Sequence, residues 1–295
     1  MSERFAGRYQ LLRPLGRGGM GEVFLARDLA TGAECALKRL ALGPGLLPPD
    51  ALAREFEALT RVRHPEIVAV HELGFAPDGT PYYTMEYVPG LAADRALARG
   101  DWAGLCFVAA RIAHGLEALH GAGVVHGDLK PSNVLVVPGA AGALPAGLRL
   151  LDFGLAALLG RERRGHRGTP GYAAPEMVRG EAANVSSDLY GLGATLYALI
   201  AGRPAFEAEE VGALLRLQQE GPPPAVPLEE SGAPEGLIRL VLRLMAPQPA
   251  ERPADAREVR HALERIHPAA RRPLSARLQA VSLVGREREL ARLAP

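Results

Sequence analysis

Two lysines stand out in a chain that otherwise uses arginine for its positive charges. Lys38 and Lys130 are the only lysines among the 34 Lys and Arg residues. A lysine ammonium is a compact charge on a flexible stem, and a broad planar guanidinium does not replace it where a compact cation is needed. The pattern indicates that both lysines take part in a reaction, and the neighbouring residues indicate which reaction.

Lys130 lies in the segment His126-Gly-Asp128-Leu-Lys130-Pro-Ser-Asn133. A carboxylate such as Asp128 can orient a hydroxyl group and accept its proton. Lys130 can neutralise charge on a transferring phosphoryl group, and Asn133 can ligate a metal ion. Asp152-Phe-Gly154 comes 19 residues after Asn133, and its carboxylate can bind Mg²⁺. The order of these residues predicts metal-assisted phosphoryl transfer.

A glycine-rich segment, Gly16-Arg-Gly-Gly-Met-Gly21-Glu-Val23, precedes Lys38. Glycines let the backbone approach phosphates closely and leave N–H groups facing the anion. Alone the pattern is weak, because many glycine-rich hairpins are only turns. A strand is expected after it, which argues against a dinucleotide-binding βα unit.

Lys38 could reach the α- and β-phosphates of a nucleotide if a carboxylate held its stem. Glu55 and Glu57 both lie on the helix expected next in the chain. We favour Glu55 as the partner of Lys38; the alternative is that Glu55 lies on a solvated helix face.

The wider pattern predicts an α+β protein with two lobes. Short apolar segments separated by glycine-containing turns predict an antiparallel sheet in residues 9–40, and residues 68–74 and 81–87 predict two further strands. From about residue 91 apolar residues recur at helical spacing, for example in residues 108–119, 189–199 and 259–266. A small sheet-rich lobe is therefore expected to precede a larger helical lobe.

The bulk composition is that of a soluble globular protein, with 48% hydrophobic and 23% charged residues. A formal net charge of +1 gives no electrostatic reason to expect a nucleic-acid partner. Cys35 and Cys106 are expected to be buried free thiols. The eight histidines show no spacing typical of metal ligands. No signal peptide or membrane-spanning run is predicted, so we expect a cytoplasmic location.

Taken together, these segments and Ala174-Pro-Glu176 resemble the eukaryotic-type Ser/Thr protein kinases of bacteria. The resemblance implies a two-lobed protein-kinase fold, ATP with Mg²⁺ or Mn²⁺ as cofactors, and protein substrates with a Ser or Thr acceptor. It implies catalytic roles for Asp128, Lys130, Lys38 and Glu55, and metal binding by Asn133 and Asp152. The nucleotide site that it implies consists of Gly16, Arg17, Gly18, Gly19, Gly21, Val23, Ala36, Lys38, Met85, Glu86 and Val88.

Within that site Met85 resembles the gatekeeper, and Glu86 and Val88 resemble the hinge that binds adenine. Thr169 resembles the residue that bridges the catalytic Asp and Lys. Asp188 resembles the helix residue that supports the catalytic loop, and Arg252 resembles the partner of Glu176. The last four of these residues are expected to build the structural and substrate platform.

The expected domain boundaries follow from the resemblance and from composition. Residues 9–266 form the kinase domain, with an N-lobe at 9–85, a hinge at 86–91 and a C-lobe at 92–266. Residues 267–282 are expected to be a linker. Residues 283–295 resemble the start of a further, ATPase-like domain, so we expect a longer protein and a regulatory partner or downstream domain.

The chain departs from the family pattern at Gly127, where most members have an arginine before the catalytic Asp. That arginine is understood to pair with a phosphorylated residue of the activation loop. Between Gly154 and Gly168 this chain has no Ser, Thr or Tyr. The two absences agree, so activation is expected not to depend on phosphorylation of this loop. The loop is instead basic, which is typical of a solvated segment or of one that contacts an acidic partner.

Two other functions remain open from the sequence. A pseudokinase that acts as an ATP-binding signalling scaffold would be expected to lack Lys38, Asp128 or Asp152, and all three are present. A small-molecule phosphotransferase shares the His-Gly-Asp segment but lacks a segment such as Thr169-Pro-Gly-Tyr-Ala-Ala-Pro-Glu176.

Overall fold

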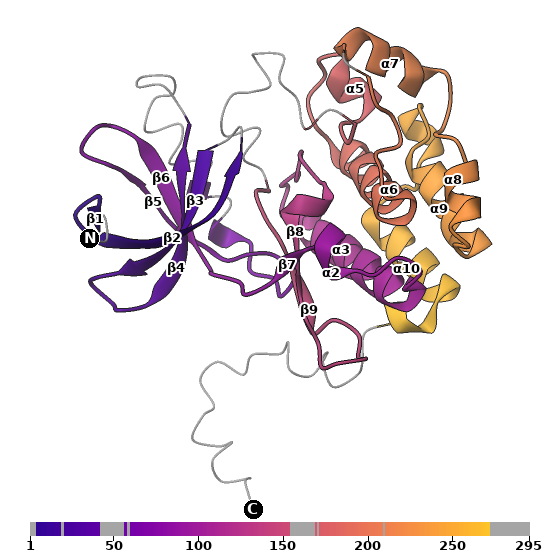
Figure 1. Ribbon diagram of the computed structural model, residues 1–295. Helices are drawn as coiled ribbons and strands as arrows, with labels where there is room; N and C mark the ends of the chain where they lie inside the picture. Colours follow the sequence, from indigo (N-terminus) through magenta and orange to yellow (C-terminus); the bar gives the residue numbers. More distant parts are fainter. Residues whose placement is uncertain are drawn as a thin grey trace, which may run out of the picture.

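A sheet-rich lobe and a helical lobe lie side by side in this computed structural model (Figure 1). The structure describes residues 4–18, 21–41, 56–57, 60–153, 169, 171–208 and 210–271. The N-lobe strands are β1 (Arg4–Phe5), β2 (Tyr9–Gly18), β3 (Gly21–Asp28), β4 (Glu34–Leu40), β5 (Val70–Phe75) and β6 (Pro81–Met85). The strands expected from the sequence are present, and β1 is an additional short strand.

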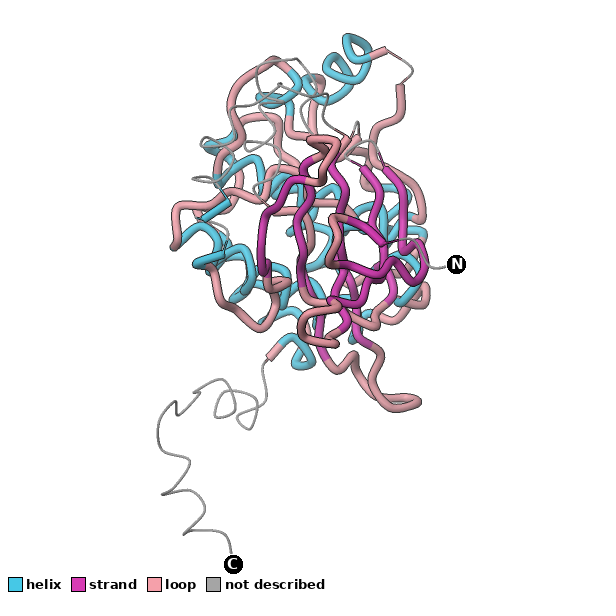
Figure 2. The backbone as a smooth tube through the Cα atoms, turned by 90° about the vertical axis from the view of Figure 1, so that its left-hand side faces the viewer, coloured by secondary structure: helices cyan, strands magenta, loops and turns pink. Residues whose placement is uncertain are grey.

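The six strands form one antiparallel sheet in the order β1-β2-β3-β4-β6-β5. In Figure 2 these strands run side by side in front of the helices. β4 lies between β3 and β6, and its register pairs Lys38 with Val23 on one side and with Tyr83 on the other. A residue in the middle of a sheet has a fixed position, which suits Lys38 to a precise contact.

The C-lobe begins with a three-stranded sheet, β7 (Leu91–Ala92), β8 (Val134–Val137) and β9 (Gly147–Leu150). Leu91, expected at the end of the hinge, is thus the first residue of β7. The described helices of the C-lobe are α2 (Ala93–Ala96), α3 (Trp102–Gly121), η1 (Pro131–Asn133), α5 (Pro175–Val178), α6 (Val185–Ala201), α7 (Val211–Gln219), α8 (Val226–Glu230), α9 (Glu235–Leu244), η3 (Pro249–Glu251), α10 (Ala256–Ile266) and η4 (Pro268–Ala270).

Two long helices form the centre of the C-lobe core. On α3 the leucines and isoleucine expected to face inward are fully buried, and Asp101 caps the helix by accepting a hydrogen bond from the N–H of Gly104 at 2.8 Å. The first turn of α6 is closed by a capping box between Asn184 and Ser187. The helix ends at Gly202, whose φ of 73° is the left-handed conformation that glycine adopts without strain. These caps fix both ends of α6, the first turn with Asp188 and the C-terminal end at Gly202.

The last described residues continue past α10. η4 packs against α3, and Ala270 is buried. Residues 272–295, which include most of the expected linker and all of the expected further domain, lie outside the described residues. The division of the chain into domains and a linker therefore stays a prediction. Among the described residues, no helix has both the length and the apolar character needed to cross a membrane.

Candidate active site

Lys38 reaches across from the N-lobe to Asp152. Its Nζ lies 2.5 Å from Oδ2 of Asp152, and the Lys38 side chain is only 3% exposed. The expected partner Glu55 lies outside the described residues, so the Lys38–Glu55 pair stays a prediction. Since a buried ammonium needs a counter-charge, Asp152 is what stabilises Lys38 in the described part of the site.

Tyr83 is a second group that holds Asp152. Its hydroxyl donates a hydrogen bond to Oδ1 at 2.9 Å. Complete burial raises the pKa of Tyr83 well above its usual range, and the neighbouring carboxylate raises it further, so the phenol stays protonated as a donor. Tyr83 is there because the β4–β6 register places it beside Lys38.

The backbone of Asp152 adopts a φ of 59°, which few residues other than glycine populate. Such a conformation persists only where surrounding contacts hold it. Here Lys38 and Tyr83 each hold one carboxylate oxygen, and Phe153 is buried in the core. Asp152 is therefore pre-positioned at the junction of the two lobes.

The second charged group of the site is Asp128, which accepts hydrogen bonds on both carboxylate oxygens. Oδ1 accepts from the main-chain N–H and from the hydroxyl of Thr169, each at 3.0 Å. Oδ2 accepts from Nζ of Lys130 at 2.8 Å and from Nδ2 of Asn133 at 3.3 Å. Because Lys130 also donates to the Thr169 hydroxyl at 2.5 Å, these residues form one connected network.

Asn133 is the last residue of the short helix η1, which begins directly after Lys130. Its Nδ2 also donates to the main-chain carbonyl of Asp128 at 2.8 Å. Both of these bonds use the amide nitrogen, so the amide oxygen remains as an acceptor. Oxygen atoms are the ligands that Mg²⁺ prefers, and Asn133 and Asp152 both supply them. The donor set thus fits a hard divalent cation.

Asp188, in the first turn of α6, holds the backbone of the segment 126–133 at its start. Its carboxylate accepts from the N–H groups of His126 and Gly127, each at 2.8 Å, and contacts Nε2 of His120 at 2.8 Å. Gly127 has a φ of 76°, a conformation that favours glycine over any residue with a side chain. A glycine at position 127 therefore avoids the backbone strain that an arginine would have in this conformation.

His126 is completely buried beneath this turn, and its Nε2 has no partner among the described residues. Burial lowers the pKa of His126 against the opposing effect of the carboxylates around it. The ring is therefore neutral near pH 7, and its Nδ1 accepts a hydrogen bond from the main-chain N–H of Asp128 at 3.4 Å.

Glu176 and Arg252 form a buried bidentate ion pair, with N–O distances of 2.6 and 3.0 Å. Both side chains are at most 1% exposed. Arg252 further donates to the carbonyls of Ala246 and Ser186 and lies over the ring of Tyr190 at 5.0 Å. These contacts anchor the segment after Thr169 to the end of α9 and the start of α6.

The glycine-rich hairpin is formed by β2 and β3, with Gly16 opposite Val23 and Gly18 opposite Gly21. Gly21 has a φ of 134°, and a Cβ there would lie 1.8 Å from the carbonyl oxygen of Arg39. Glycine is therefore required at this position. Arg17 is exposed and pairs with Glu22 at 3.1 Å. Gly19 lies outside the described residues.

Four of the residues expected to line the nucleotide site belong to one hydrophobic cluster. Ala36, Met85 and Val88 are buried in it, and Val23 packs against it. Glu86 has another role: its carboxylate accepts from Nε of Arg149 at 3.2 Å, and its N–H donates to the carbonyl of Ala69 at 2.8 Å. Glu86 thus ties the hinge to the segment before β5 and to β9.

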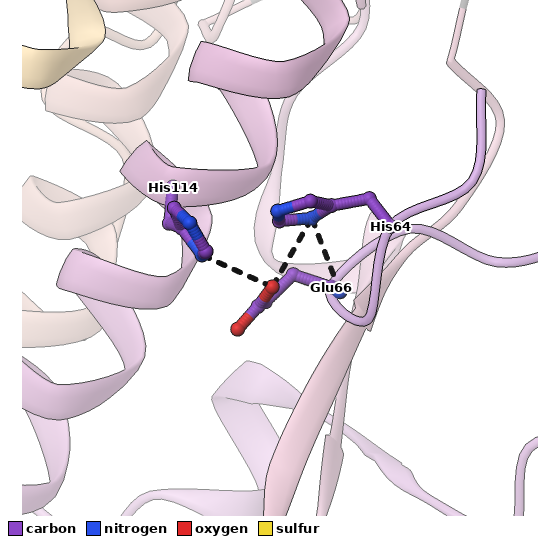
Figure 3. A group of neighbouring side chains, drawn as sticks. All are labelled: His64, Glu66 and His114. Atoms are coloured by element: carbon purple, nitrogen blue, oxygen red, sulfur yellow. Dashed lines mark hydrogen bonds and ion pairs between the residues drawn. The ribbon is translucent and has the colours of Figure 1, made fainter. Parts of the chain in front are cut away.

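Besides the Lys38–Asp152 pair, two arrangements near the site were not predicted from the sequence. One is the contact of Tyr83 with Asp152, whose only signal is its register opposite Lys38. The other joins His64, Glu66 and His114 (Figure 3). Nδ1 of His64 and of His114 lie 3.1 and 3.2 Å from the same oxygen of Glu66, although Glu66 and His114 are 48 residues apart.

The donor atoms of these three residues lie within 4.8 Å of one another, close enough for a metal ion. Nη1 of Arg111, however, lies 3.5 Å from the other oxygen of Glu66, and its charge disfavours a second cation. The main-chain carbonyl of Glu66 also accepts from the N–H of Leu150 at 2.8 Å. The cluster therefore serves to attach the segment that precedes β5 to α3 and β9.

The chain matches the protein kinase domain family over residues 9–264. It is 34% identical to a protein named Serine/threonine-protein kinase pkn3 of Myxococcus xanthus, over 94% of this chain and 53% of that protein. It is 35% identical to the DNA damage-responsive serine/threonine-protein kinase RqkA of Deinococcus radiodurans, over 87% of this chain and 39% of that protein. The chain thus spans roughly half or less of these two relatives.

A solved structure with the same fold is that of a mutant of the Mycobacterium tuberculosis PknI kinase domain. It aligns with a TM-score of 0.65 at 26% identity and covers 92% of this chain and 98% of that one. The expected two-lobed α+β fold and the expected family are thereby confirmed, and this chain belongs to the protein kinase domain family.

Proposed function

We propose that the chain is a Ser/Thr protein kinase that transfers the γ-phosphoryl group of ATP to hydroxyl groups of protein substrates. The observation that carries this proposal is the network in which Thr169, Lys130 and Asn133 hold both oxygens of Asp128. The bacterial relatives named above are Ser/Thr protein kinases, which supports the same acceptor class here.

In this proposal Asp128 orients the acceptor hydroxyl and takes its proton as transfer proceeds. Lys130 lies beside that carboxylate, where its positive charge can stabilise the charge that develops on the transferring group. Thr169 fixes the distance between the two. Positioning and electrostatic stabilisation account for most of the catalysis in this class of reaction.

When bound, ATP would supply the phosphoryl group, and Mg²⁺, or Mn²⁺ in its place, would neutralise its charge. Asp152 and Asn133 are the proposed metal ligands, because both present oxygen atoms at the lobe junction. Lys38 is the proposed partner of the α- and β-phosphates, with Glu55 as a second counter-charge. The segment with Gly16, Gly18, Gly19 and Gly21 would cover the phosphates, and Val23, Ala36, Met85, Glu86 and Val88 would line the rest of the nucleotide site.

The kinase is proposed to be active without phosphorylation of its activation loop. Gly127 carries no side chain that could pair with a phosphate, and residues 154–168 contain no hydroxyl to accept one. The hydroxyl of Thr169 is engaged by Asp128 and Lys130. Control is instead proposed to come from a regulatory partner or a downstream domain. The buried free thiols Cys35 and Cys106 support a cytoplasmic location.

The experiment that tests the proposal is transfer of labelled phosphate from Mg-ATP to a generic Ser/Thr protein substrate and to the chain itself, with the labelled sites mapped. The expected result is label on Ser or Thr residues other than Thr169. A protein that binds Mg-ATP but transfers nothing would favour the scaffold alternative. Transfer to small hydroxyl compounds without transfer to proteins would favour the small-molecule alternative. Activity that requires phosphate on Thr169 would contradict loop-independent activation.

A further inference from the structure

An open cavity of about 570 Å³ lies next to the catalytic segment. Lys130, Ser132 and Thr169 line one side of it, and α2 with the loop that follows and the C-terminal end of α6 line the rest. This volume is within the range of about 300–1,000 Å³ that is typical of ligand sites. By comparison, the cavities beside Asp128 and behind Met85 hold about 10 Å³ each.

The charges that line this cavity are mostly positive. Three of the lining residues are cations, Arg99, Lys130 and Arg203, and one is an anion, Asp94. Lys130 is already engaged by Asp128 and Thr169. Arg99 and Arg203, by contrast, are exposed and form no ion pair or hydrogen bond in the part of the chain that the structure describes. Two guanidinium groups are therefore available to a ligand.

Arg99 is held in place by its packing on the end of α6. A Cβ atom on Gly202 would lie 1.6 Å from an Nη atom of Arg99, so the guanidinium lies directly against the glycine backbone. Gly202 is the C-cap of α6, and the partial negative charge at a helix C-terminus attracts a cation. Arg203 directly follows Gly202 in the chain, so Arg99 and Arg203 both lie at the C-terminal end of α6.

We propose that this cavity selects acceptor peptides that carry an acidic side chain near the acceptor hydroxyl, with Arg99 and Arg203 as specificity-determining residues. Guanidinium groups bind carboxylates and phosphates through paired N–H donors, so an Asp, a Glu or a phosphorylated residue fits. A peptide with Arg or Lys at the same place meets two like charges. The inference rests on the proposed function, because it takes the ligand of this cavity to be the acceptor peptide.

Binding of labelled peptides to the full chain, measured by fluorescence anisotropy with Mg²⁺ and a non-hydrolysable ATP analogue, tests the inference independently of phosphate transfer. Each peptide carries one serine, flanked by Asp, phosphoserine, Gln or Arg in an alanine background. The variants are Arg99→Gln with Arg203→Gln, Arg203→Gln alone, and Arg265→Gln as a matched control. Arg265 is an exposed arginine of α10 and does not line the cavity.

For the wild type and for Arg265→Gln, we expect the Asp peptide to bind about tenfold more tightly than the Gln peptide, as two exposed charge-assisted contacts can provide. We expect the ratio to fall to about one in the double variant. Arg203→Gln alone, which leaves the packing of Arg99 on Gly202 intact, is expected to lose part of the ratio. Tighter binding of the phosphoserine peptide than of the Asp peptide would identify phosphate as the preferred source of charge.

Equal affinity for the Asp and Gln peptides, or a preference that survives the double substitution, would overturn the inference. The same peptides incubated with Mg-ATP report on the proposed function separately. An acidic preference in binding without any transfer would support recognition of acidic peptides by Arg99 and Arg203 and would contradict the kinase proposal.

Discussion

The main-chain N–H and the hydroxyl of Thr169 both donate to Oδ1 of Asp128, each at 3.0 Å. Thr169 directly precedes the segment that Glu176 anchors to Arg252, whereas Asp128 belongs to the turn that Asp188 holds. The contact thus joins two separately anchored segments at the point where the acceptor hydroxyl is proposed to bind.

Replacing Thr169 with Val is expected to lower kcat by about 10–100-fold, because the hydroxyl that links Asp128 and Lys130 is lost while the side chain keeps its shape. Thr169→Ser keeps the hydroxyl and is expected to stay within about threefold of the wild type. Steady-state kinetics with a protein substrate measures both variants. If Val and Ser at this position gave equal rates, the hydroxyl would have no part in positioning Asp128.

Tyr83→Phe removes the hydrogen bond to Oδ1 of Asp152. We expect a loss of about 1 kcal/mol in the free energy of unfolding and a rise in the Mg²⁺ concentration needed for half-maximal transfer. The matched control is Tyr197→Phe, which removes a hydroxyl that donates to the carbonyl of Pro224 in the C-lobe. The control is expected to lose similar stability with no change in Mg²⁺ requirement; an identical shift in both would show that Tyr83 does not act on the metal site.

Arg252→Met leaves the Glu176 carboxylate buried without its partner. A loss of about 3–5 kcal/mol in the free energy of unfolding is expected, as for other buried ion pairs broken on one side. Urea denaturation of Arg252→Met, of Glu176→Gln and of the double variant measures the coupling. Since the double variant has no uncompensated charge, it is expected to be more stable than Arg252→Met, and additive losses would argue against a coupled pair.

Glu66 makes a pH-dependent contribution to stability. Burial raises the pKa of Glu66, but the hydrogen bond from His114 and the charges of His64, His114 and Arg111 outweigh it and lower the pKa below 4.5. A carboxyl group with a lowered folded-state pKa stabilises the fold above its unfolded pKa, and this stability is lost as the pH falls through the folded value.

Glu66→Gln is therefore expected to cost about 2–4 kcal/mol near pH 7, because Arg111 loses its counter-charge. The difference from the wild type should shrink below about pH 4.5, where the unfolded carboxyl becomes protonated. Chemical denaturation of both proteins from about pH 2.5 to about pH 8 measures this difference. A difference that does not change with pH would mean that the charge of Glu66 contributes nothing.

Much of the candidate site could be predicted from the sequence because its residues are close together in the chain. Asp128, Lys130 and Asn133 lie within six residues, and a short turn with a 3₁₀ helix is enough to bring them together. The helices α3, α6 and α10 were likewise evident from the spacing of their buried apolar residues. Asp152 could be predicted as a metal ligand from its segment, although its contact with Lys38 needed the fold.

Other features of the structure depend on contacts between residues that are far apart in the chain, and no local sequence pattern predicts such contacts. Tyr83 reaches Asp152 only because β4 and β6 pair in one particular register. His64 and Glu66 meet His114 only because the segment before β5 packs on α3. Arg99 reaches Gly202 through the packing of the loop after α2 against the end of α6. Each of these contacts joins residues that are far apart in the chain.

The most direct test of the account is the effect of Asp128→Asn on ATP binding and on phosphate transfer, measured side by side. Asp78→Asn, at an exposed turn between β5 and β6, is the matched control. We expect Asp128→Asn to bind Mg-ATP within about threefold of the wild-type affinity but to transfer phosphate at least about 10³-fold more slowly, while the control matches the wild type in both. Transfer by Asp128→Asn at a rate close to the wild type would contradict the role assigned to this carboxylate.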